Sequence, residues 1–258
     1  MNLLKKQLFI FDKDDTITDT KSPLEPNMAL LLANISNNKP VAIISGSSWS
    51  VFQEQIIDFL DVTTNFSNLH LLPASGSQYY TYSAVSAEWQ QVYDFSIPRE
   101  KFNDIKKLLL ESFNKLPEKF KPAKIFSEQV ENRQGQISLS ALGQIAPRDL
   151  KKTWDNNRKK RQMMVEYLTP RLQDYDVKIG GSTSIDVTRK GINKEFGVRK
   201  LLKNLQLTAD AAIYFGDSLG KDGNDAIVKN ISNLDTIAVS GHHETLQVLK
   251  NYSDNMSN

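Results

Sequence analysis

Three short apolar runs, separated by long helical patterns, constrain the fold of this chain more than any other feature. The runs are Gln7–Phe11, Pro40–Ile44 and Ala211–Phe215, and each is followed at once by polar residues. Strands that are apolar throughout, rather than on alternate residues, are buried on both faces, which is typical of parallel sheets covered by helices. The sequence therefore predicts an α/β fold with a doubly wound, Rossmann-like parallel sheet.

The middle third of the chain has a different pattern. From about Gln78 polar and apolar residues alternate, and residues 128–139 are predicted to form a hairpin that turns near Gln134 and Gly135. Helical patterns near 99–116 and 147–168 accompany these strands, the second as one long amphipathic helix. This segment is predicted to be an inserted α+β cap domain that contains an antiparallel sheet.

The parallel pattern returns after the insert, so the first and last segments belong to one sheet. We place the core at residues 1–83 and 188–258 and the inserted cap at residues 84–187, within several residues of each boundary.

Composition excludes several classes of protein. The 258 residues contain no cysteine, which excludes disulfide frameworks, thiolate metal sites and cysteine nucleophiles. A net charge of +2 gives no field that favours nucleic acid, and the basic run Arg158–Gln162 is expected on a solvated helix face. No apolar stretch has the length of a signal-peptide core or a membrane span. We therefore expect a cytoplasmic protein that binds neither nucleic acid nor membrane.

Two carboxylates, Asp12 and Asp14, follow the first apolar run. Open α/β sheets bind ligands at this edge, and residues two apart in an extended strand point to the same side, away from Asp15. Carboxylates this close favour a bound cation, or a proton held for chemistry. We predict that Asp12 is a nucleophile toward a phosphoryl group and that Asp14 is the acid and base. An acidic turn is the alternative.

Small polar residues and a lysine complete this predicted site. Ser45, Gly46 and Ser47 stand between a strand and a helix, where hydroxyl and backbone N–H groups suit a phosphate oxygen, although serine is also a common helix cap. Lys194 begins a helix near the return from the insert. Beside the nucleophile it would neutralise the transferring phosphoryl group, whereas elsewhere it would be a solvated lysine.

A second acidic segment supplies candidate metal ligands. Asp217 ends the third apolar run, and Asp225 follows eight residues later in a loop that contains glycine. Mg²⁺ takes oxygen ligands and keeps several waters, so a few carboxylates are an adequate site. We predict a Mg²⁺ site formed by Asp12, Asp14, Asp217 and Asp225, the last of them through water.

These motifs, in this order, resemble those of the haloacid dehalogenase-like phosphotransferases. The resemblance rests on an Asp-x-Asp-x-Thr motif at residues 12–16, a strand that ends in serine, a lysine and an acidic Gly-Asp motif. It covers residues 5–75 and 188–245.

The insert and its flanks are similar to eukaryotic-type phosphomannomutases in particular. The similar segments are Glu131–Gly143, Gly180–Val187, Gly191–Lys194 and Gly223–Asp225. By this resemblance Arg133, Ser184 and Asp186 would bind the distal end of a sugar phosphate. Two further family arginines fall at Gln144 and near Arg148 or Lys151, so one planar fork for phosphate is replaced by a neutral amide.

The resemblance leaves two activities open. One is a mutase that interconverts mannose 1-phosphate and mannose 6-phosphate, or the corresponding glucose phosphates, through an aspartyl-phosphate. The other is a sugar-phosphate phosphatase with the same residues. A non-catalytic binding protein is a third interpretation, which the presence of both Asp12 and Asp14 disfavours. The family resemblance also implies a homodimer through the cap.

Overall fold

The computed structural model describes residues 3–133, 135–221 and 223–256, which fall into two compact units. The core unit comprises Met1–Asp94 and Asn193–Asn258, and the insert unit comprises Phe95–Ile192. Both boundaries lie later in the chain than residues 83 and 188, where the sequence pattern placed them.

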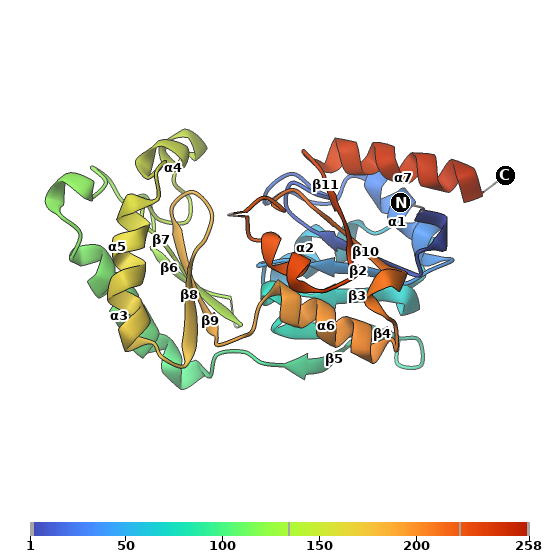
Figure 1. The fold of residues 1–258 in the computed structure, drawn as a ribbon, viewed down its shortest axis with the longest axis horizontal. Coiled ribbons are helices and arrows are strands. Elements are labelled where there is room, and N and C mark those ends of the chain that lie inside the picture. Colours follow the sequence, from blue (N-terminus) through green and yellow to red (C-terminus); the bar gives the residue numbers. More distant parts are fainter. Residues whose placement is uncertain (1–2, 134, 222, 257–258) are drawn as a thin grey trace. The chain divides into compact units, whose positions relative to one another are not determined.

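The core unit is built on a seven-stranded sheet in the order β11-β10-β1-β2-β3-β4-β5 (Figure 1). The strands are β1 (Leu8–Asp12), β2 (Val41–Ile44), β3 (Leu69–Leu72), β4 (Gln78–Ser83), β5 (Glu88–Asp94), β10 (Ala212–Gly216) and β11 (Asp235–Ala238). Its helices are α1 (Pro26–Ser36), α2 (Trp49–Gln55), α6 (Lys194–Asn204) and α7 (His242–Met256). The first three strands and the last two are mutually parallel, which confirms the predicted Rossmann-like sheet.

Alternate residues of β1 pack on opposite faces of this sheet. Phe9 and Phe11 join the apolar cluster that contains α1 and α7, whereas Leu8 and Ile10 join the cluster that contains α6. Every one of these side chains is fully buried, and each contributes about 1.5–3 kcal/mol through burial. The same alternation directs Asp12 toward the face that α6 covers.

The two strands with the alternating pattern that begins near Gln78 belong to the core sheet, and the second of them, β5, lies inside the predicted insert of residues 84–187. β4 is antiparallel to β3, and β5 pairs with β4 at the sheet margin. Their alternating pattern arises because an edge strand is half exposed, and mixed sheets often carry such antiparallel margins. A ring stack of 3.9 Å between Trp49 of α2 and Tyr80 of β4 fastens this margin to the core. The core unit therefore extends to Asp94.

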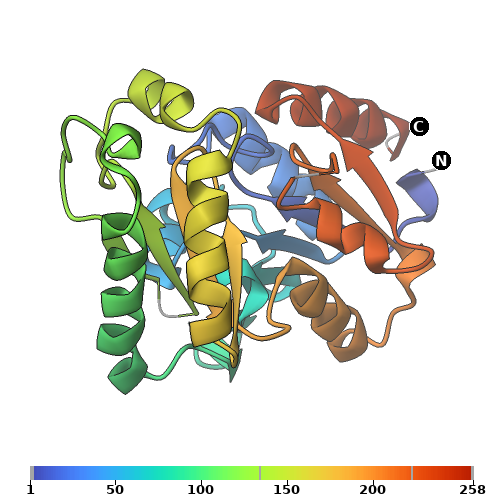
Figure 2. The ribbon, with the colours of Figure 1, turned by 60° about the vertical axis from the view of Figure 1, so that its left-hand side comes forward.

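The insert unit has a four-stranded antiparallel sheet in the order β6-β7-β9-β8. Its elements are α3 (Phe102–Asn114), β6 (Val130–Asn132), β7 (Gln136–Ser140), α4 (Arg148–Trp154), α5 (Lys159–Leu168), β8 (Tyr175–Ile179) and β9 (Ser184–Arg189). Helices α3 and α5 cover one face, where Ile137 and Leu139 are fully buried (Figure 2). The predicted hairpin is confirmed by the β6–β7 pairing, while Gln134 lies outside the described residues.

The single helix predicted for residues 147–168 is wrong, because α4 and α5 are separated at Asp155–Arg158. Arg158 has a left-handed φ of 59°, and the Asp155 carboxylate accepts hydrogen bonds from the first N–H groups of α5. Aspartate and asparagine favour such caps over helix interiors. The basic run is also partly buried, since Arg161 forms a 2.8 Å ion pair with Asp155. Within the described ranges, no helix is both long and apolar enough to span a membrane.

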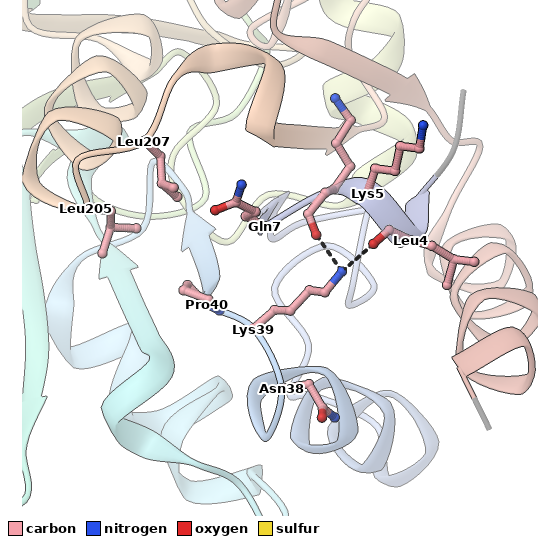
Figure 3. A pocket seen from close by; sticks show the side chains of 9 residues that line it. Leu4, Lys5, Gln7, Asn38, Lys39, Pro40, Leu205 and Leu207 are labelled. Carbon is pink, nitrogen blue, oxygen red and sulfur yellow. Dashed lines mark hydrogen bonds between the residues drawn. The ribbon is translucent and has the colours of Figure 1, made fainter. Parts of the chain in front are cut away.

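A cavity of about 390 Å³ lies at the amino edge of the core sheet, beside Gln7 and Pro40 (Figure 3). The ammonium of Lys39 donates to the carbonyl oxygens of Leu4 and Lys6 at 2.8 and 2.6 Å. This lysine therefore holds the segment before β1 against the sheet and has little capacity left for an anion. The carboxyl edge, where Asp12 lies, is the opposite edge.

His70 makes the stability of the core unit depend on pH. Its Nδ1 shares a 2.8 Å hydrogen bond with the hydroxyl of Tyr79, and burial lowers the pKa of His70 from 6.5 to about 4. Between these values the unfolded chain binds a proton that the folded chain does not. The stabilisation that depends on neutral His70 is therefore present in full above pH 6.5 and is lost as the pH falls toward 4.

We expect a change from pH 7 to pH 5 to lower the free energy of unfolding by about 2 kcal/mol through His70. A His70→Gln variant should lack this contribution and show a shallower pH dependence. Urea unfolding of both proteins at the two pH values measures the difference. Equal pH dependence in the two proteins would contradict this account.

Candidate active site

The carboxyl edge of the core sheet brings three loops together. Asp12 pairs in register with Ile44 of β2, and Phe11 pairs with Phe215 of β10. Ser45 and Asp217 follow these neighbouring strands directly, so the chain leaves the sheet beside Asp12 on both sides.

Lys194 reaches Asp12 from the first position of α6. Asn193 caps this helix, because its side chain accepts a 3.1 Å hydrogen bond from the Phe196 N–H. The Lys194 ammonium contacts Oδ1 of Asp12 and Oδ1 of Asp225, the latter at 2.6 Å. Lys194 is 3% exposed, so the ion pairs are shielded from water.

Two glycines allow α6 to begin this close to the sheet. A Cβ added to Gly197 would lie 2.9 Å from the Cα of Gly76, nearer than real contacts allow. Gly76 also has a left-handed φ of 83°, which favours glycine. The close approach places the start of α6, and therefore Lys194, at the strand end.

Asp225 is fully buried and has several donors. Its Oδ1 accepts from Lys194 and, at 2.6 Å, from the hydroxyl of Tyr214, while Oδ2 accepts from the Ser218 N–H at 3.2 Å. Glycine is needed at residue 216, since a Cβ there would lie 2.6 Å from Oδ2 of Asp225. Asp225 therefore anchors Lys194 rather than facing solvent.

Asp12, Asp217 and Asp225 form a group able to hold a metal ion, with ligand atoms within 4.8 Å of one another. Three carboxylates and the Lys194 ammonium leave a formal charge of −2, which one divalent cation would balance. An all-oxygen set with an accessible member suits Mg²⁺, which keeps several waters. Asp14, predicted as a fourth ligand, does not belong to this group.

Burial and the unbalanced charge together shift the pKa values of the ionisable groups in this site. Burial raises the pKa of Asp12 to about 7, with Lys194 lowering it and the neighbouring Asp225 and Asp14 raising it. Burial likewise raises the pKa of Asp217. Burial opposes the charged form of Lys194, but the two carboxylates outweigh it and raise the lysine's pKa. Positive charge near Asp12 would therefore favour its ionised, nucleophilic form.

The serine loop and Asp14 lie next to each other. The Ser45 hydroxyl is 3.2 Å from the Ser47 hydroxyl and 3.5 Å from Oδ2 of Asp14, and it accepts from the Ser47 N–H at 3.1 Å. Within the described part of the chain the Gly46 N–H makes no hydrogen bond. Hydroxyl groups and one backbone N–H are thus available beside the carboxylates.

The insert unit brings together another part of the predicted site. Ser184 and Asp186 lie on β9 opposite Ser140 and Ser138, and the Ser138 hydroxyl donates to Asp186. A Cβ on Gly180 would contact the carboxylate of Asp186, so a larger residue at this position would displace that carboxylate. These side chains point away from the helix-covered face, where Ile137 and Leu139 lie.

The basic residues predicted in the insert have their own partners. Arg133 forms a 2.9 Å ion pair with Glu131, and Arg148 begins α4. Gln144 donates its side-chain amide to the Gln129 carbonyl at 3.1 Å, and the Lys151 ammonium donates to the Gln144 carbonyl at 2.6 Å. Lys151 therefore supplies a cation beside the position at which the family arginine is replaced.

Sequence reasoning missed Tyr214 and Lys13, which contact the acidic groups, and Gln55, which contacts Lys13. Tyr214 is the one side chain of β10 that carries a polar group. It pairs in register with Ile10 of β1 and therefore points to the same face of the sheet as Asp12. That alternation along the strand could have found it. Lys13 stands between the two aspartates of the first motif and was assigned no role, and Gln55 carries no sequence signal.

Asp217 and Asp225 should differ when each is changed to asparagine. Asp217→Asn should leave the thermal midpoint in EDTA almost unchanged but reduce the stabilisation that Mg²⁺ gives, because the more accessible carboxylate holds the ion. Asp225→Asn should lower the midpoint in EDTA by several degrees, because it weakens a buried ion pair. Thermal unfolding with and without Mg²⁺ measures both effects. The reverse pattern would contradict these roles.

The sequence of this chain is similar to those of known phosphomannomutases. The model of the family described as eukaryotic phosphomannomutase matches residues 28–253. A phosphomannomutase of Schizosaccharomyces pombe is 28% identical over 226 residues, covering 85% of this chain and 84% of that protein. Phosphomannomutase 2 of Dictyostelium discoideum is 24% identical, covering 98% of each chain.

Solved structures share the fold at lower identity. An N-terminally truncated IMP-nucleotidase of Plasmodium falciparum superposes with a TM-score of 0.69 at 16% identity, covering 95% of this chain and 69% of that one. A haloacid dehalogenase-like hydrolase of Bacteroides thetaiotaomicron gives 0.63 at 15% identity, covering 96% and 99%. Both confirm the predicted fold class.

Proposed function

The chain belongs to the eukaryotic phosphomannomutase family, and from this premise we propose that it interconverts the 1- and 6-phosphates of mannose through a phosphoryl group carried by Asp12. The observation that carries the proposal is the buried Lys194 bound to both Asp12 and Asp225 at the edge where ligands bind. The family match begins at residue 28, so the role of Asp12 rests on this geometry.

In the first half-reaction Asp12 attacks one phosphorus of a bound hexose 1,6-bisphosphate, which gives phosphorylated Asp12 and a hexose monophosphate. Lys194 holds the carboxylate in one orientation and offers positive charge to the transferring oxygens, which stabilises the transition state. Asp14 gives its proton to the departing sugar oxygen as the bond from phosphorus to that oxygen breaks. Ser45 and the Gly46 N–H are suited to bind a phosphoryl oxygen.

The residues present fit a Mg²⁺ ion. Asp12 and Asp217 would hold it, with Asp225 behind them, because their three carboxylates exceed the charge of Lys194. When bound, the ion would neutralise charge on the phosphoryl oxygens.

In the second half-reaction the phosphoryl group passes from Asp12 to the free hydroxyl at C1 or C6 of a hexose monophosphate, which forms the bisphosphate again. Asp14 takes the proton from that hydroxyl, which restores the starting state. Family membership supports a role for Arg133, Ser184 and Asp186 in binding the distal phosphate or sugar hydroxyls, with Arg148 and Lys151 adding positive charge. A retained hexose bisphosphate is what separates a mutase from an enzyme that releases its product.

A sugar-phosphate phosphatase is the second candidate, and the Gln144 contact favours it. The amide of Gln144 is neutral and is bonded to the Gln129 carbonyl, so it adds no charge for a second phosphate. Weaker binding of the distal phosphate of the acceptor would leave the phosphorylated Asp12 open to water for longer. Cytoplasmic location and a homodimer through the insert stay predictions.

Asp12→Asn should abolish turnover, with kcat lower by about four orders of magnitude or more, because the amide cannot accept the phosphoryl group. The assay supplies mannose 1-phosphate, Mg²⁺ and a catalytic amount of hexose 1,6-bisphosphate. Formation of the 6-phosphate supports the mutase, and release of inorganic phosphate alone supports the phosphatase. A folded Asp12→Asn variant with wild-type activity would exclude the covalent mechanism.

Gln144→Arg should raise the ratio of isomerisation to phosphate release by about tenfold, because a guanidinium binds phosphate through two hydrogen bonds. Gln144→Leu removes the amide without adding charge and serves as the matched control. The two products are measured in the same reaction mixture. If both variants change the ratio equally, charge at residue 144 does not govern bisphosphate retention.

A further inference from the structure

Lys13 is a fully buried lysine that the proposed mechanism does not use. Its side chain is 0% exposed, and its ammonium donates to Oδ1 of Asp14 at 2.8 Å and to Oε1 of Gln55 at 2.9 Å. Taking an ammonium out of water costs several kcal/mol unless acceptors replace the lost hydration. Here the acceptors include the carboxylate assigned to proton transfer.

The backbone of Lys13 is also fixed. Its carbonyl oxygen accepts hydrogen bonds from the N–H groups of Thr16, Ile17 and Thr18, at 3.3, 3.0 and 3.1 Å. These bonds close the turn that follows β1. The lysine is therefore held at the backbone by the turn and at the ammonium by Asp14 and Gln55.

The same contacts distinguish the two oxygens of Asp14. Oδ1 accepts from the Lys13 ammonium and from the Lys21 N–H, each at 2.8 Å. Among the described residues, Oδ2 has only the Ser45 hydroxyl at 3.5 Å, and that hydroxyl is nearer to the Ser47 hydroxyl. The Asp14 side chain is 31% exposed, so Oδ2 is open to a substrate atom while Oδ1 is occupied.

Gln55 completes the arrangement from the end of α2. Its side-chain amide nitrogen donates to the Lys21 backbone carbonyl at 3.4 Å, and its backbone carbonyl accepts from the Leu24 N–H at 2.8 Å. Lys21 has a left-handed φ of 59°, which turns its N–H toward Asp14. The loop after β1 is therefore tied to α2 through the residues that hold Asp14.

From these contacts we infer that Lys13, supported by Gln55, is a positioning residue that fixes Asp14 so that Oδ2 alone transfers the proton in both half-reactions. As the Asp12 oxygen bonds to phosphorus, the electron pair of the breaking bond goes to the sugar oxygen, which takes the proton from Oδ2. In the reverse sense Oδ2 takes the proton of the attacking hydroxyl as the bond between Asp12 and phosphorus breaks. The inference rests on the proposed function.

Leaving groups of different basicity test this role. Phosphorylation of Asp12 by mannose 6-phosphate requires protonation of an alkoxide, whereas p-nitrophenyl phosphate releases a stable anion that needs no proton. In Lys13→Met the phosphorylation rate with mannose 6-phosphate should fall by about tenfold to a hundredfold. The rate of the p-nitrophenol burst should stay within about twofold of wild type. Rapid-quench and stopped-flow measurements give the two rates.

Matched variants separate positioning from loss of structure. Lys6 is also a buried lysine, paired with Asp235 at 2.7 Å on the amino edge of the sheet, and Lys6→Met should change neither rate. Gln55→Leu leaves the Lys13 ammonium in place without its second acceptor and should show a weaker form of the Lys13→Met pattern. Thermal unfolding of each variant reports on folding independently.

A double-mutant cycle tests whether Lys13 acts through Asp14. Asp14→Asn should slow phosphorylation by mannose 6-phosphate, and adding Lys13→Met to it should slow the step no further. Additive losses, or equal losses with both phosphate donors, would overturn the inference. Failure of the proposed function would look different, since neither donor would then phosphorylate Asp12 in the wild-type enzyme.

Discussion

The contact of one buried ammonium with two carboxylates is the interaction on which the rest of the site depends. Lys194 pairs with Asp12 and Asp225 where water is excluded, and removing one partner of such a pair costs about 3–5 kcal/mol. Several features of the fold serve it: the Asn193 cap, the close approach of α6 to the sheet, and the Tyr214 hydroxyl on Asp225. Stability and chemistry therefore depend on the same atoms.

The local pattern of the sequence was sufficient to predict most of this edge. Continuous apolar strands identify a parallel sheet, and polar residues at their carboxyl ends must then meet, so Asp12, Ser45 and Asp217 could be grouped without a structure. β5 could not be assigned correctly, because the alternation of a partly exposed strand is the same at the margin of a core sheet as in a separate sheet. Which sheet such a strand joins depends on long-range contacts.

The role of each residue was harder to predict than which residues form the site. Asp225 and Asp14 were both expected to bind a metal ion; Asp225 belongs to the acidic group that could hold one but is also bonded to Lys194, and Asp14 is bonded to Lys13 instead. These roles depend on contacts between residues that are far apart in the chain, such as the contact between Lys13 and Gln55. Gln144, which replaces a family arginine, lies in the insert unit, and Lys13 lies in the core unit. Gln144 concerns the binding of the second phosphate, which distinguishes a mutase from a phosphatase, whereas Lys13 contacts the carboxylate proposed for proton transfer.

The central claim, that the phosphoryl group is carried by Asp12, is tested most directly by chemical mapping of the intermediate. The enzyme is quenched during turnover of hexose phosphate, treated with borohydride, which reduces an acyl phosphate to an alcohol, and digested for mass spectrometry. The account predicts homoserine in place of aspartate at residue 12, dependent on substrate. Reduction at another carboxylate, or at none while turnover proceeds, would contradict it.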